Sequence, residues 1–144
     1  MNEYRIMKNR QQKEVDEFPL FFAFNQQQFD EGMRKFGLQP NETNKIYKLG
    51  STGGFYLRTD SDKLNEMFLR HAQEITAAIE NDATGDGFIF EMFNYELANH
   101  EYIVSGDVSY TLDALGFTFD EVNSSATLLR GLKKAIKAQE KWEG

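Results

Sequence analysis

Apolar residues in the second half of the chain recur at the spacing of amphipathic helices. Between residues 62 and 80 they return every three or four positions, which is the repeat of one helix face. Thr59, Asp60 or Ser61 is suited to cap the start of this helix. His71 falls on the apolar stripe, so we interpret it as a core or boundary residue rather than a metal ligand.

Two more helices are predicted downstream of this one. Residues 88–101 are apolar on nearly every side, as expected of a helix at the centre of a fold. A buried strand over residues 88–93 is the alternative for the start of this segment. Residues 107–115 suggest a short helix that Gly116 would stop.

The C-terminal segment, residues 124–144, predicts an amphipathic helix capped by Ser124 or Ser125. Its apolar side consists of Leu128, Leu129, Leu132, Ala135, Ile136 and Trp142. Its cations fall within about 100° of one another on the opposite side, and they are Arg130, Lys133, Lys134, Lys137 and Lys141. This basic face is solvated, offsets acidic charge inside the fold, or touches an anionic membrane or nucleic acid.

The first half of the chain is less regular. Residues 1–17 are polar and rich in helix formers, which favours a peripheral helix or a flexible arm. The dense apolar run FPLFFAF, residues 18–24, is expected to be buried. Asn25 and Gln28 form a capping-box pattern that opens a helix through about residue 36.

Residues 45–58 read as two short strands around the loop GSTGG, residues 50–54. A phosphate-binding loop is disfavoured because no GK[ST] follows and the next element is a strand. With no repeat or linker in the 144 residues, we predict one α+β domain over residues 1–144, predominantly helical with one β-hairpin.

Composition narrows the functional classes. No apolar run approaches the roughly 18 residues that cross a bilayer, and residues 1–15 lack the apolar stretch of a secretory signal. We therefore expect a soluble, cytoplasmic protein without membrane contact. The absence of cysteine excludes disulfides, thiolate zinc sites and cysteine nucleophiles, and we expect no cofactor.

The net charge of −7 is unevenly divided along the chain. Residues 1–58 hold nine Lys and Arg against seven Asp and Glu, and residues 124–144 hold five against two. Residues 59–123 hold two against fourteen, a balance of −12. Nucleic-acid binding through a broad cationic face is therefore disfavoured, whereas a basic protein or a cation suits the middle of the chain.

One residue combination resembles a metal or catalytic site. Glu96 and His100 share a helix face, Asp107 follows, and these types bind divalent metals or transfer protons. An ordinary Glu96–His100 pair is the favoured interpretation, because no two-histidine metal signature is present. A calcium loop starting at Asp82 is disfavoured because its twelfth position is Phe93, so we expect a plain turn there.

Residues 96–102, ELANHEY, and 111–122, TLDALGFTFDEV, resemble a group of small uncharacterised proteins encoded by low-GC Gram-positive bacteria, often in prophages or mobile elements. The resemblance extends over roughly residues 18–122. It implies an accessory protein of phage or horizontally transferred DNA and supplies no catalytic residue, cofactor or substrate.

The function predicted from these observations is a non-enzymatic intracellular accessory protein that binds a partner with a basic surface. The candidate contact residues are Asp82, Asp86, Glu91, Glu96, Glu101 and Asp107. The alternative is a metal-binding protein or metal-dependent hydrolase that uses Glu96, His100 and Asp107. A homo-oligomer held together by the surplus Phe residues is a third interpretation.

Overall fold

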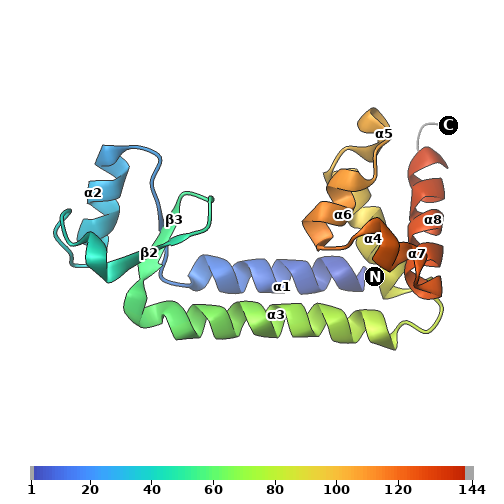
Figure 1. The fold of residues 1–144 in the computed structure, drawn as a ribbon, viewed down its shortest axis with the longest axis horizontal. Helices are drawn as coiled ribbons and strands as arrows, with labels where there is room; N and C mark the ends of the chain where they lie inside the picture. The colour runs from blue at the N-terminus through green and yellow to red at the C-terminus, as the bar shows by residue number, and fades with distance from the viewer. Residues whose placement is uncertain (1, 142–144) are drawn as a thin grey trace. The chain divides into compact units, whose positions relative to one another are not determined.

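The computed structural model describes residues 2–141 and shows eight α-helices with a three-stranded antiparallel sheet (Figure 1). The predicted α+β class with predominant helices is therefore confirmed. The helices are α1 (Glu3–Glu17), α2 (Gln26–Lys35), α3 (Ser61–Asn81), α4 (Phe88–Asn99), α5 (Tyr102–Ser105), α6 (Ser109–Leu115), α7 (Phe119–Asn123) and α8 (Ala126–Lys141). The strands are β1 (Phe21–Phe22), β2 (Ile46–Leu49) and β3 (Gly54–Leu57), and short 3-10 turns cover Thr43–Lys45 and Arg58–Asp60.

The chain divides into two compact units. Unit 1 contains residues 1–10 and 73–144, and unit 2 contains residues 11–72. Both boundaries fall inside a helix, one in α1 and one in α3, so no Pro- or Gly-rich linker separates the units. The expectation of one domain over residues 1–144 stays a prediction.

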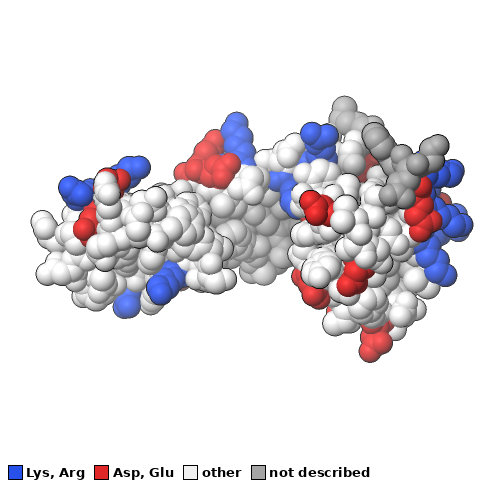
Figure 2. Space-filling view, turned by 90° about the horizontal axis from the view of Figure 1, so that it is seen from above, with Lys and Arg blue, Asp and Glu red and all other residues white. Residues whose placement is uncertain are grey.

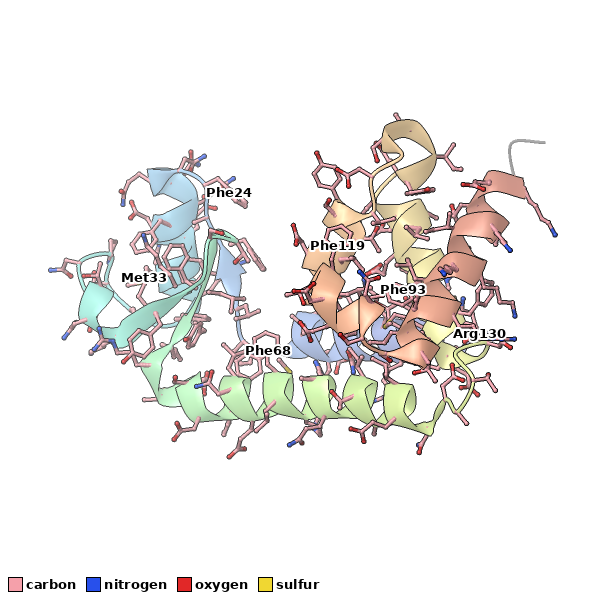
Figure 3. All side chains as sticks on the ribbon, turned by 45° about the vertical axis from the view of Figure 1, so that its right-hand side comes forward. Phe24, Met33, Phe68, Phe93, Phe119 and Arg130 are labelled. Atoms are coloured by element: carbon pink, nitrogen blue, oxygen red, sulfur yellow. The ribbon has the colours of Figure 1, made fainter. Side chains whose placement is uncertain are left out.

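The core of unit 1 is built around α4. Its buried side chains face several directions, and they are Phe88, Ile89, Met92, Phe93 and Leu97. Because these side chains need cover on several sides, α4 packs closely against α8 and also contacts α5 and α6. Figure 3 shows Phe93 inside this group of helices. The helix prediction for this segment is confirmed, and the alternative of a strand over residues 88–93 is wrong.

The basic-faced helix is confirmed as α8. Leu128, Leu132 and Ala135 are buried, whereas the cations on the opposite side are exposed. The Ser125 Oγ accepts a hydrogen bond from the Leu128 N–H at 3.2 Å, so Ser125 is the cap. The predicted apolar position Trp142 lies outside the described residues.

Two short helices of unit 1 are not predicted from the periodicity. α5 has four residues and α7 has five, too few for an apolar repeat to show. Thr118 and Glu121 form a capping box that starts α7. The predicted helix before Gly116 is α6, and Gly116 ends it with a φ of 78°.

Unit 2 contains the sheet, with strand order β1-β3-β2. The predicted hairpin is β2 and β3, and β1 adds a third strand beside β3. Phe21 is buried, but Phe22 and Phe24 are exposed, so the expectation that the whole run of residues 18–24 is buried is wrong. The reason is that successive side chains of a strand point to opposite faces, and only one face of this sheet is covered.

The covering helix of the sheet is α2. Phe21, Met33 and Ile46 form the buried centre of unit 2, and Figure 3 labels Met33 on α2. The predicted cap is present, since the Asn25 Oδ1 accepts from the Gln28 N–H at 2.8 Å. The Gln28 Oε1 accepts a hydrogen bond from the backbone N–H of Phe24 at 2.7 Å, whereas in a standard capping box it would accept from the N–H of Asn25.

Within the predicted helix or arm of residues 1–17, Glu3–Glu17 form the helix α1, whose second half pairs with α3 inside unit 2. The Glu14 carboxylate accepts hydrogen bonds from Arg70 and lies 2.9 Å from His71 Nε2. His71 is buried, which confirms its interpretation as a core or boundary residue. No helix within residues 2–141 is both long enough and apolar enough to span a membrane.

Candidate partner-binding surface

Asp82 organises the turn between α3 and α4. Its two carboxylate oxygens accept backbone N–H bonds from Gly85, Gly87 and Ile89 at 3.0 to 3.1 Å, and from Thr84 at 3.3 Å. Burial alone would raise the pKa of Asp82, but these donors, led by the Ile89 N–H, outweigh burial and hold that pKa below its usual range. The plain turn predicted here is present, and the Asp82 carboxylate is occupied in building it.

Gly85 allows this turn to approach α8. Its φ is 90°, and a Cβ at this position would lie 2.2 Å from the carbonyl oxygen of Thr127. Only glycine combines the positive φ with so close a contact.

Asp86 is paired with the basic face of α8. Arg130 donates from Nε to Oδ1 at 2.8 Å and from Nη2 to Oδ2 at 3.0 Å, while Lys134 Nζ lies 3.9 Å from Oδ1. The hydrogen bonds from Arg130 hold the pKa of Asp86 below its usual range. Figure 2 shows Lys and Arg side chains grouped at the α8 end of unit 1. One acidic residue of the middle segment is thus offset by this basic face.

Glu91 and Glu96 attach α1 to α4. The Glu91 Oε2 accepts the backbone N–H of Glu3 at 2.8 Å, at the start of α1 where the helix dipole favours an anion. Glu96 is 2% exposed, and its carboxylate accepts from Lys8 Nζ at 2.8 and 3.0 Å and from Tyr4 Oη at 3.2 Å. Burial and the Glu96 charge raise the pKa of Tyr4 above its ordinary value.

The predicted metal residues do not meet in one cluster. Glu96 takes its partners from α1, His100 ends α4, and the Asp107 carboxylate accepts from the N–H and Oγ of Ser109 at 2.8 and 2.5 Å. These bonds from Ser109 lower the pKa of Asp107. Within residues 2–141, no three His, Asp or Glu side chains are grouped to hold a metal ion.

The remaining surface with unusual chemistry lies on residues 101–125, which we call the acidic–apolar segment. It contains five carboxylates and no Lys, Arg or His. None of the five forms an ion pair with a cation of the described part of the chain. The acids are Glu101, Asp107, Asp113, Asp120 and Glu121.

The same segment exposes large apolar side chains. Val104 is 83% exposed, Tyr110 59% and Phe119 53%, and Ile103 is exposed as well. Figure 3 labels Phe119 at the start of α7. Of the six predicted contact residues, Glu101 and Asp107 belong to this segment. The other four accept hydrogen bonds that build the turn before α4 or join separate helices of unit 1, whereas Asp107 accepts from Ser109, two residues along the chain.

The sequence did not identify Tyr110, Asp113, Phe119 and Asp120 as candidate contact residues. The available signal was the absence of any cation over residues 101–125, a range that also contains many large apolar residues. Short helices hide which of their apolar residues are buried, so the sequence alone does not identify the exposed ones.

Comparison with known proteins gives one match. The protein family described as "Family of unknown function (DUF7659)" matches residues 3–138, which includes every helix and strand except the end of α8. No curated protein and no solved structure matches the chain.

Proposed function

We propose, for a chain that belongs to the family of unknown function DUF7659, that it is a non-enzymatic accessory protein that binds a protein partner through the acidic–apolar segment. The observation that carries this proposal is the coincidence of five carboxylates, no cation and three strongly exposed apolar side chains within residues 101–125.

The chemistry of the segment describes its partner. Exposed apolar side chains surrounded by polar groups are typical of protein interfaces, because burying them in a contact removes apolar area from water. Clustered carboxylates attract a basic surface and accelerate the encounter, an effect that salt screens. The partner therefore presents Lys or Arg around an apolar contact area.

The setting of this activity follows from the resemblance of residues 96–102 and 111–122 to proteins of low-GC Gram-positive bacteria and their phages. We propose an intracellular role for a phage or mobile-element protein that occupies a basic surface of a host component. This setting rests on the resemblance alone.

Co-purification tests the proposal. The tagged protein and its Tyr110→Ala/Phe119→Ala variant are used to capture partners from host lysate at low salt and at about 0.5 M salt, where screening is strong. The matched control is Leu69→Ala, which truncates an exposed apolar residue of α3 in unit 2. We expect the wild type and the control to retain a partner that the double variant loses, with weaker retention at high salt.

The opposite pattern would count against the proposal. If the double variant recovers the same partner as the wild type while its thermal unfolding is unchanged, the acidic–apolar segment is not the contact surface.

A further inference from the structure

The sheet of unit 2 ends at β2 on one side, because the strand order is β1-β3-β2. Alternate residues of a strand direct their backbone N–H and C=O groups to opposite neighbours. The N–H of Ala23, directly after β1, donates to the Gly53 carbonyl oxygen at 2.9 Å, so Gly53 and every second residue after it face β1. Gly54 and Tyr56 therefore direct their backbone groups to β2.

The register leaves the outer side of β2 unpaired. The residues opposite Gly54 and Tyr56 are Leu49 and Tyr47, whose backbone groups bond β3. Ile46 and Lys48 therefore direct their backbone groups away from the sheet. The Ile46 carbonyl oxygen accepts from Arg58 Nε at 3.4 Å, but within residues 2–141 no hydrogen bond outside the sheet uses the Lys48 backbone. β2 is thus a free edge to which another strand can add.

An apolar cavity of about 360 Å³ lies beside this edge. It is on the face of the sheet that α2 covers, since the register places Lys48 opposite Phe55 and Phe55 opposite the buried Phe21. The Phe29 and Phe55 rings meet edge to face in its wall, with centroids 5.3 Å apart, and both remain partly exposed. The rest of the lining includes Gln26, Thr43, Ile46 and Lys48. The cavity can therefore receive an apolar side chain of a ligand.

Lys48 adds a positive charge to the cavity. Its side chain is exposed and lies on the same face as the cavity that it lines. Lys45 is ion-paired with Glu42 at 2.5 Å, but Lys48 forms no ion pair with an acidic residue of the described part of the chain. Residues 43–59 contain no Asp or Glu. An acidic group of a ligand is therefore the complement of Lys48.

We propose that the edge of β2 binds an extended peptide, which adds to the sheet as a fourth strand and places an apolar side chain in the cavity. In strand addition, main-chain hydrogen bonds supply affinity and pockets for alternate side chains supply specificity. Peptide residues opposite Ile46 and Lys48 point to the α2 side, because cross-strand neighbours share a face. The recognised peptide therefore carries an apolar residue two positions from an Asp or Glu.

The edge suits a peptide better than other occupants. A second copy that added its own β2 would bring a second Lys48, with no acid in its hairpin to compensate. A small apolar molecule would fill the cavity but leave the outward backbone groups of β2 unpaired. A peptide satisfies the backbone, the cavity and the charge together. This surface belongs to unit 2, so its partner is separate from the one proposed for residues 101–125 of unit 1.

Panning a phage-displayed library of random peptides of about 12 residues on the full chain supplies the probe. We expect the enriched peptides to share an apolar residue two positions from an Asp or Glu. The tightest of them is synthesised with a fluorescent label, and its affinity for the full chain and for each variant is measured by fluorescence anisotropy.

Gln26→Trp fills the cavity and should weaken binding of this peptide by about tenfold or more. Gln27→Trp is the matched control, because Gln27 is the next residue of α2 and does not line the cavity. Each glutamine donates to an acid four residues later, Asp30 or Glu31, so both variants lose an equivalent exposed hydrogen bond.

Lys48→Pro tests the main-chain contribution. Proline removes an N–H that points away from the sheet, so the bonds between β2 and β3 should remain, as they do where proline occurs on natural edge strands. We expect this variant to lose measurable binding while its thermal unfolding stays close to wild type. Lys48→Gln keeps the N–H and should weaken binding only a few-fold. Lys35→Gln, an exposed change on α2, should have no effect.

Methylation of the peptide's own amide nitrogens, one position at a time, requires no variant of the protein to fold. A peptide paired with a single strand edge uses the N–H of every second residue. Methylation should therefore abolish binding at alternate positions and be tolerated at the positions between them.

Four results would overturn the proposal. They are no enriched peptide that binds at about 100 µM protein, equal binding by Gln26→Trp and Gln27→Trp, no alternation in the effects of amide methylation, and a dimer detected by light scattering that Lys48→Pro dissolves. The last result would assign the edge of β2 to a second copy.

Discussion

Glu96 places a negative charge in the core of unit 1, where a carboxylate is stable only if donors surround it. Lys8 and Tyr4 supply those donors from α1. They are 88 and 92 residues away in sequence, and for that reason the sequence suggested a metal or partner site at Glu96 instead. The sequence identifies Glu96 as a residue with reactive chemistry, but its hydrogen-bond partners depend on the tertiary fold.

Removing Lys8 should destabilise the protein. Lys8→Met leaves the buried Glu96 charge without its cation, and we expect a loss of about 2–3 kcal/mol in the free energy of unfolding, less than for a fully buried pair because Lys8 is partly exposed. Adding Glu96→Gln to Lys8→Met should recover part of that loss, since the charge is gone. Urea denaturation measures both values.

Lys13→Met is the control on the same helix. Lys13 and Glu17 form an exposed pair at 4.0 Å, so this change should stay within about 0.5 kcal/mol of wild type. Equal losses for Lys8→Met and Lys13→Met would show that the Glu96 cluster contributes nothing specific.

At the scale of elements, helices with enough turns to repeat their apolar pattern were predicted to within a few residues, as α3, α4 and α8 show. Local signals also sufficed for the cap at Asn25 and the stop at Gly116. β1, α5 and α7 were missed because each is five residues or shorter. β1 is a strand because it pairs with the edge of β3, and residues 18–24 alone give no sign of that pairing.

Gly131→Ala tests the close packing of α4 and α8. Helix propensity alone predicts a gain of about 1 kcal/mol. The new Cβ, however, would lie 2.4 Å from Ile89 Cγ2 and 2.8 Å from the Gly85 carbonyl oxygen. We expect overpacking to win, with a net loss of about 1–3 kcal/mol in the free energy of unfolding, measured by thermal or urea denaturation. A stabilised variant would mean that the two helices lie further apart.

The α1–α3 pairing in unit 2 should depend on pH through Glu14. Hydrogen bonds from Arg70, then from His71, lower the pKa of Glu14 from 4.5 to about 2. A lowered pKa stabilises the folded state above the unfolded value of 4.5, and this contribution is lost as pH falls toward 2. Measured as Tm against pH, Glu14→Gln should be less stable than wild type above pH 4.5 and should approach it near pH 2.

Glu17→Gln, at the end of the same helix, serves as the comparison for that experiment. Glu17 forms only an exposed pair with Lys13 at 4.0 Å among the described residues, so its replacement should change the Tm little. A constant difference for Glu14→Gln as well would contradict the assigned role of Glu14.

At the scale of the whole molecule, two groups can be distinguished among the acidic residues that give residues 59–123 a charge balance of −12. Asp82, Asp86, Glu91 and Glu96 accept hydrogen bonds that build the turn before α4 and join α4 to α8 and α1. The carboxylates of residues 101–125 form no ion pair with the described cations, and the same range contains exposed apolar side chains. The charge count alone indicated an acidic protein. The fold distinguishes acids that join separate elements from those of residues 101–125, where Asp107 and Glu121 accept hydrogen bonds from neighbours in the chain.

Amide hydrogen exchange on the protein alone and on its purified complex tests the central claim most directly. The account predicts that the partner slows exchange within residues 101–125, above all in α6 and α7, while α2 and the amides of α8 exchange as before. Unchanged exchange over residues 101–125, together with protection elsewhere in the chain, would contradict it.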